Sequence, residues 1–116
     1  DLRFLTALRT EPTAVAETRT EAQPERFRLE QNIPNPFNSQ TTIGFSLVQD
    51  APVELAIYNL SGQRVATLVD GQRMAGRYSV QWDGRDDTGY ALASGVYLYR
   101  LRSGRHVETR KLLLLQ

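Results

Sequence analysis

Large apolar side chains alternate with small or polar ones in several separate stretches of this sequence. The clearest sets are Ile43, Phe45 and Leu47, then Val53, Leu55 and Ile57, then Tyr78, Val80 and Trp82. Successive side chains of a β-strand point to opposite faces of a sheet, so this period of two indicates strands with one buried face. No stretch carries a sustained helical period with capping residues, and we therefore expect little or no helix.

Turn-forming pairs separate these apolar stretches and recur about every 8 to 12 residues, the spacing of an all-β sandwich or barrel. They include Asn35-Pro36, Ser61-Gly62, Asp83-Gly84 and Ser103-Gly104. The pattern predicts seven strands, over residues 27–31, 41–48, 52–59, 63–69, 76–82, 95–102 and 105–114. Local hairpins are expected at 58–63 and 103–104, and a looser one at 69–76. The longest interruption, 83–94, is expected to cross from one sheet to the other.

The N-terminal residues have a different composition from the rest of the chain. Residues 11–25 include Pro12 and Pro24 and contain no large apolar side chain except Val15. Such a segment cannot bury enough apolar surface to offset the entropy of ordering, which favours a linker. A docked or partly helical segment is the alternative.

We therefore divide the chain into two parts. Residues 1–26 are predicted to be a linker or the tail end of a preceding domain, and residues 1–10 are compatible with a short strand. Residues 27–116 are predicted to be the folded domain. The chain begins at Asp1, without Met, which suggests a piece of a larger protein.

Charge and composition exclude several classes of partner. The net charge of +1 gives no basic excess that would drive nucleic-acid binding. Cysteine is absent, which removes disulfides, zinc–thiolate sites and thiol nucleophiles. The longest apolar run, residues 112–115, is far too short to span a bilayer, so we expect no membrane insertion.

Nothing in the sequence assembles a catalytic site. A serine–histidine–aspartate catalytic triad would require His106, because it is the only histidine. This residue stands just after a predicted turn, where an exposed strand end is the expected environment. No G-x-S-x-G motif supplies a serine nucleophile. We predict that the chain is not an enzyme and has no cofactor.

The carboxylates Asp83, Asp86 and Asp87 are the strongest metal candidate. Calcium prefers several oxygens on a tight loop bent by glycine. The segment nevertheless departs from the EF-hand pattern, because Arg85 occupies a ligand position and no Glu follows at the twelfth position. Aspartate and glycine also form ordinary turns, which is the alternative to a calcium site.

Six aromatic residues are candidates for a sugar-binding surface. They are Tyr58, Tyr78, Trp82, Tyr90, Tyr97 and Tyr99. Several of them facing solvent together would form a stacking platform. Aromatic side chains on strands more often pack in a core or on a sheet face, which is the alternative.

From Leu29 onward the chain resembles a known family. The most specific matching stretches are Asn35-Pro36-Phe37-Asn38, Trp82-Asp83-Gly84, Gly95-Val96-Tyr97 and Thr109-Arg110-Lys111-Leu112. They resemble the type A C-terminal sorting domain of the type IX secretion system of Bacteroidota. Ser39 and Val48 stand where that family often has proline. The related immunoglobulin-like domain of flagellar hook-capping proteins shares two of these stretches. The resemblance implies a seven-stranded, immunoglobulin-like antiparallel β-sandwich with an N-terminal linker.

The resemblance also implies a function. Such a domain is a non-catalytic signal that directs a passenger, here N-terminal to Asp1, across the outer membrane to the cell surface or extracellular space. Its partners would be the type IX translocon, an outer-membrane shuttle barrel and a sortase-like surface peptidase, with cleavage within residues 18–26. Some members keep the domain. The alternative function is an extracellular structural, adhesive or carbohydrate-binding accessory module.

Two regions are candidates for distinct roles. The motif at Asn35, Pro36, Phe37 and Asn38 is expected to close one end of the sandwich, with Phe37 as a plug. Trp82 is expected to fill the space between the sheets. The last strand is the predicted partner-binding element. Its candidate residues are Thr109, Arg110, Lys111, Leu112, Leu113, Leu114 and Leu115. A sheet edge there would pair with a partner's sheet, whereas leucines in the core are the alternative.

Overall fold

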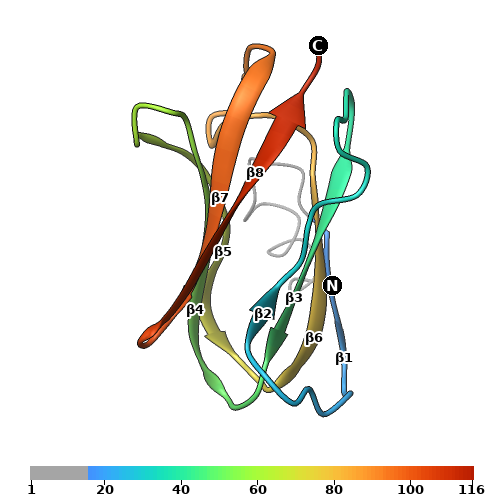
Figure 1. The fold of residues 1–116 in the computed structure, drawn as a ribbon, viewed down its shortest axis with the longest axis vertical. Helices are drawn as coiled ribbons and strands as arrows, with labels where there is room; N and C mark the ends of the chain where they lie inside the picture. The colour runs from blue at the N-terminus through green and yellow to red at the C-terminus, as the bar shows by residue number, and fades with distance from the viewer. Residues whose placement is uncertain (1–15) are drawn as a thin grey trace, which may run out of the picture.

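Eight strands form the described part of the chain, which covers residues 16–116 of the computed structural model. They make two four-stranded antiparallel sheets that pack face to face (Figure 1). The strands are β1 (Glu17–Thr20), β2 (Arg28–Leu29), β3 (Thr41–Leu47), β4 (Ala51–Tyr58), β5 (Arg64–Arg73), β6 (Gly76–Trp82), β7 (Gly95–Ser103) and β8 (His106–Leu114). The all-β sandwich is thus confirmed, with eight strands in place of seven. Within residues 16–116, no helix has the length and apolar character needed to cross a membrane.

The first sheet has the order β1-β6-β3-β2 and the second the order β5-β4-β7-β8. The predicted hairpins β4–β5 and β7–β8 are confirmed, and so is the crossing between sheets from β6 to β7. A local pairing of β5 with β6 was also expected, and this prediction is wrong. Strand β5 runs on to Arg73, and the next strand begins in the other sheet at Gly76. A side chain at Gly76 would meet the backbone oxygen of Thr20 at 2.5 Å, so this turn requires glycine.

Strand β1 lies in the region for which a linker was expected and a docked segment was the alternative, and residues 17–20 form such a docked strand. The strand pairs with β6 at the edge of the first sheet. Arg73 of β5 forms an ion pair with Glu17 at 2.7 Å, and the Arg19 guanidinium donates to the carbonyl of Ala75. An edge strand held by its backbone needs little apolar surface, which is why composition did not predict it. The strand suggested for residues 1–10 lies outside the described residues, and the domain boundary near residue 26 stays a prediction.

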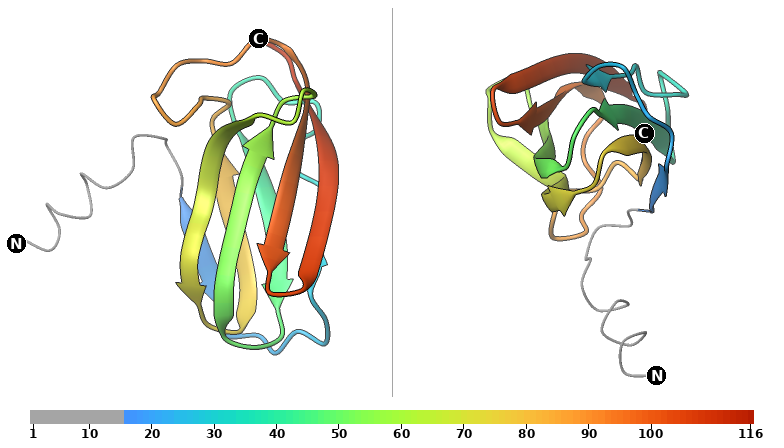
Figure 2. Two further views of the ribbon diagram at one scale, coloured as in Figure 1. Left: turned by 90° about the vertical axis from the view of Figure 1, so that its left-hand side faces the viewer. Right: turned by 90° about the horizontal axis from the view of Figure 1, so that it is seen from below.

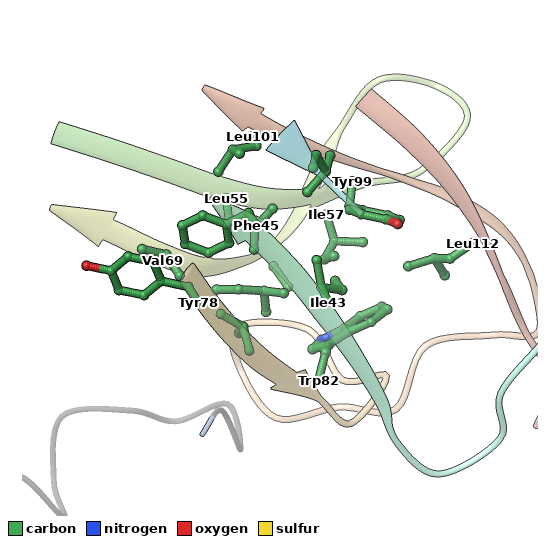
Figure 3. Close-up of a cluster of buried hydrophobic side chains, with 14 of the residues drawn as sticks. Ile43, Phe45, Leu55, Ile57, Val69, Tyr78, Trp82, Tyr99, Leu101 and Leu112 are labelled. Atoms are coloured by element: carbon green, nitrogen blue, oxygen red, sulfur yellow. The ribbon is translucent and has the colours of Figure 1, made fainter. Parts of the chain in front are cut away.

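The core fills the space between the two sheets (Figure 3). Trp82 is completely buried and its indole nitrogen donates to the carbonyl of Arg85, so its one polar group is satisfied. Phe45 and Tyr78 stack with ring centroids 4.9 Å apart. Along β6 buried and exposed residues alternate strictly, as the sequence pattern predicted.

A buried hydrogen-bond network ties the second sheet to the segment that follows β2. We call residues 30–37 the bridging segment. The Tyr99 hydroxyl on β7 donates to the carbonyl of Glu30 at 2.7 Å and accepts the backbone N–H of Asn32 at 2.8 Å. The Asn32 side chain in turn donates to the Thr41 hydroxyl and to the carbonyl of Pro34. Because every one of these groups is paired, the network fixes the path of the segment.

Removing the Tyr99 hydroxyl tests this network. Tyr99→Phe leaves the Glu30 carbonyl and the Asn32 N–H without their partner in a buried site. We expect the free energy of unfolding to fall by about 1–3 kcal/mol in urea denaturation. Tyr90→Phe, at a solvent-exposed tyrosine, is the control and is expected to change stability little. Equal stability of the two variants would show that the hydroxyl contributes nothing.

The same residue predicts a dependence of stability on alkaline pH. Burial raises the pKa of Tyr99 to about 12, whereas an unfolded tyrosine ionises near 10. The protonated Tyr99 hydroxyl therefore stabilises the folded state fully below pH ~10. This contribution is lost as the pH rises through the pKa of Tyr99 in the folded protein. Urea denaturation from neutral pH to pH ~11 should show a loss of stability that is smaller in Tyr99→Phe. A loss of the same size in both proteins would refute the assignment.

Candidate functional site

The predicted partner-binding strand, β8, is an edge strand of the second sheet. Its side chains divide between two environments. Leu112 and Leu114 are 1% and 0% exposed and belong to the core, which corrects their place among the predicted contact residues. Thr109, Lys111 and Leu115 are exposed. The leucine run therefore anchors the strand, and the neighbouring positions present it to solvent.

Arg110, another candidate on β8, has an internal role, which it shares with its neighbour Glu108. The Arg110 guanidinium donates to the carbonyl of Leu29 on β2 at 2.7 Å. Glu108 accepts the backbone N–H of the same Leu29, also at 2.7 Å. These two bonds join the edges of the two sheets on this side of the sandwich. Leu113 is half-buried, and its backbone is hydrogen-bonded to Asn35 and Phe37.

The bridging segment already occupies part of the outer edge of β8. The Asn35 side-chain oxygen accepts the N–H of Leu113 at 2.9 Å, and the Phe37 N–H donates to the carbonyl of the same Leu113 at 3.1 Å. The Leu115 N–H donates to the carbonyl of Phe37, and the Gln31 side chain donates to the carbonyl of Lys111. The chain thus supplies for itself the kind of edge pairing that we expected from a partner.

The rest of that edge has no backbone pairing, although Leu29 of β2 lies beside it at Glu108 and Arg110. We call its unpaired part, at Val107 and Thr109, the open edge. Backbone groups of alternate residues of β8 point away from β7, and the bonds at Lys111 and Leu113 show that these are the odd-numbered ones. Within residues 16–116, no hydrogen bond is recorded on the outer side of Val107 or Thr109. The open length of edge is therefore short, about one pairing unit of a β-ladder.

Phe37 closes the end of the sandwich, as predicted. Its ring is buried and lies 5.7 Å from the ring of Trp82. Gly84 adopts a positive φ of 75°, and a side chain there would come within 3.2 Å of Leu114 and 3.6 Å of Phe37. The Trp-Asp-Gly and Asn-Pro-Phe-Asn stretches therefore meet at one place, where the positive φ and the nearby Leu114 side chain favour glycine at position 84.

The carboxylates Asp83, Asp86 and Asp87 each cap backbone donors. Asp86 accepts the hydroxyl and N–H of Thr88 and the N–H of Tyr90. These hydrogen bonds hold the pKa of Asp86 below its usual value, and the one from the Thr88 hydroxyl has the largest effect. Asp87 accepts the N–H of Thr67, which ties the loop to the edge of β5, and Asp83 accepts the N–H of Arg85.

These bonds are turn chemistry, the alternative to a calcium site. Among residues 16–116, no group of three or more histidine, aspartate or glutamate side chains is arranged to hold a metal ion.

The stretch at Gly95, Val96 and Tyr97 begins β7. The Tyr97 hydroxyl donates to the carbonyl of Ala93 at 2.7 Å, and burial raises the pKa of this tyrosine. Val96 is partly exposed on the outer face of the second sheet. The stretch thus fixes the start of a strand that pairs with β8 along its whole length.

Sequence reasoning missed the polar residues that position the motif. Asn32 and Thr41 are buried and hydrogen-bonded to each other. Their only signal in the sequence is that polar residues flank the proline motif, and that signal does not distinguish burial from exposure. His106 was predicted to be an exposed strand end, and it is the first residue of β8, where its ring stacks on Phe27 at 4.9 Å.

Comparison with known proteins gives two findings. A family model described as the FlgD Ig-like domain matches residues 31–105. Among solved structures, a chain of PorZ, described as an essential surface component of the type IX secretion system of Porphyromonas gingivalis, is similar at 18% identity and a TM-score of 0.52. That similarity covers 83% of this chain and 12% of the PorZ chain. A search of curated proteins finds no match. The family match and the two sheets confirm the predicted immunoglobulin-like sandwich.

The hydrogen bond between Asn35 and the backbone of β8 can be tested directly. Asn35→Ala leaves the Leu113 N–H without its acceptor at an exposed position. We expect faster amide hydrogen exchange at Leu113 and Leu115 and a loss of about 0.5–1.5 kcal/mol in stability. Asn35→Asp keeps an acceptor oxygen and should keep the protection. Unchanged exchange in the alanine variant would contradict the role of this side chain.

Proposed function

The chain belongs to the FlgD Ig-like domain family, and from this premise we propose that it is a non-catalytic sorting domain. Its task is to direct a passenger, joined before Asp1, across an outer membrane by the type IX secretion system. The passenger would then be attached to the cell surface or released. The likeness to PorZ supports this proposal through the fold, and the sorting-domain motifs support it through the sequence.

The observation that carries the proposal is the joining of the motif to the last strand. Asn35 and Phe37 hydrogen-bond to Leu113 and Leu115. A partner that binds β8 therefore binds a strand that is in place only when the whole sandwich has folded. This suits a signal that must report a complete domain, and it requires no reactive group.

Recognition is proposed to occur at the open part of β8. An extended segment of a partner, such as the shuttle barrel or the translocon, would pair with the backbone of Val107 and Thr109. Thr109 would take part through its backbone, and the exposed side chain of Lys111 would select the partner. Arg110, Leu112 and Leu114 support this surface from within the domain.

The same proposal locates the cleavage by a surface peptidase. The resemblance places it within residues 18–26. Residues 18–20 belong to β1, whose backbone pairs with β6. Residues 21–26 form no strand and are mostly exposed. A peptidase needs an accessible extended chain, so we propose that cleavage falls within 21–26.

An extracellular adhesive or carbohydrate-binding module is the rival function. It would need several aromatic rings side by side on the surface. Of the six aromatic residues weighed for such a platform, only Tyr90 is exposed, and Tyr58 is half-buried beneath arginine side chains. No observation on residues 16–116 favours this rival.

Fusion of residues 1–116 to the C-terminus of a soluble reporter, in a host with a type IX system, tests the proposal. We expect the reporter outside the cell or on its surface. Thr109→Pro removes the outward N–H that a partner strand would use, and it should retain the reporter in the periplasm.

Thr109→Val is the matched control, because it keeps that N–H and should be exported normally. A wild-type fusion that stays in the periplasm would count against the sorting function. Normal export of a folded Thr109→Pro fusion would count only against recognition at this edge.

A further inference from the structure

A cluster of arginines lies on the outer face of the second sheet, the face turned to the viewer in the left panel of Figure 2. Three guanidinium groups converge on the single carboxylate of Glu54 on β4. Arg64 lies 3.0 Å from it, Arg102 3.5 Å and Arg100 4.0 Å, measured between nitrogen and oxygen. Neither the predicted site nor the proposed sorting function uses these residues.

Tyr58 holds part of this cluster in position. Its hydroxyl accepts a hydrogen bond from Arg100 at 2.7 Å. The guanidinium carbons of Arg100 and Arg64 lie 4.8 Å and 5.9 Å from its ring centroid, within the range of cation–π attraction. The arginines are therefore arranged before any partner arrives, which lowers the entropy that binding would cost.

The cluster carries more positive charge than its neighbours neutralise. Glu54 offers two oxygens to three guanidinium groups, each with five N–H donors. The Nε of Arg100 is buried and has no hydrogen-bond partner in the described chain. Asp70 lies across from Glu54 in the β4–β5 register, and Lys111, on the same face of β8, adds a further positive charge. The face thus carries an excess of positive charge.

Apolar residues continue the same face. In the β7–β8 register Val96 lies opposite Leu113, and Leu98 lies opposite Lys111. Val96 is partly exposed, and Leu98 and Leu113 are half-buried. The face therefore combines arginine and tyrosine with aliphatic area, which is the composition of the energetically important part of a protein–protein interface.

We propose that this face binds a partner protein through aspartate or glutamate side chains on the partner's surface. A carboxylate would bridge Arg100 and Arg102, where bidentate pairing with a guanidinium is favoured. The partner's apolar side chains would cover Leu98 and Val96. A phosphate or an acidic glycan could meet the charge but would leave the apolar strip uncovered, so a protein is the better match.

The binding surface is tested with the full chain in a nuclear magnetic resonance titration, which does not depend on export. The probe is a short synthetic peptide rich in glutamate and leucine. We expect shifts confined to the Arg100 Nε–H and the amides of Tyr58, Leu98 and Arg102. Arg100→Gln with Arg102→Gln should weaken binding by at least about tenfold, the usual loss at charged interface residues.

The matched control neutralises two exposed arginines of the other sheet, Arg28→Gln with Arg77→Gln. This variant has the same net charge and should bind the peptide normally. If the double change at Arg100 and Arg102 disturbs the fold, Arg102→Gln alone, at an exposed side chain, takes its place and should still weaken binding measurably.

Three results would overturn the proposal. The first is an absence of shifts on this face, or equal weakening by the control variant. The second is equal binding of the same peptide with glutamine in place of glutamate, which would leave no role for charge. The third is the same pattern of shifts with inorganic phosphate at equal charge concentration, which would indicate a small-anion site.

Discussion

The Tyr99 hydroxyl is the single group on which the arrangement of this domain most depends. It stands on β7 of one sheet and binds the backbone of Glu30 and Asn32, which leave the edge of the other sheet. This fixes the path of the bridging segment, and Asn35 and Phe37 can then reach the outer edge of β8. A tyrosine suits this task because its ring fills the core and its hydroxyl satisfies two buried backbone groups at once.

The bridging segment explains what the Asn-Pro-Phe-Asn motif does physically. Asn35 and Phe37 face the chain's own last strand and the core, so they build the domain and leave partners to bind elsewhere. We propose two surfaces for recognition, the open edge at Val107 and Thr109 and the arginine face of the second sheet. They lie on the same sheet, and β8 contributes to both. One partner could therefore use backbone pairing at the edge and charge pairing on the face.

Much of the fold could be predicted from the sequence, because alternation and turn residues act locally. The strands from β3 to β8 begin and end close to where the apolar pattern predicted them, except that β5 runs on from the expected end at 69 to Arg73. Strand β1 escaped prediction because backbone pairing and two arginine contacts stabilise it without apolar burial. The link from β5 to β6 escaped because no local pattern says in which sheet the next strand lies. The candidate site was predicted only in part, since Leu112 and Leu113 look alike in sequence, and only their register on β7 separates core from surface.

We propose that partners bind the open edge of β8 on the folded domain. Photo-crosslinking during export tests it most directly, with a reactive side chain placed at Thr109 and, in a second protein, at Arg77 on the outer face of the other sheet. We expect a cross-link to a component of the secretion system from position 109 and little or none from position 77. Cross-links of equal yield from both positions, or from position 77 alone, would contradict it.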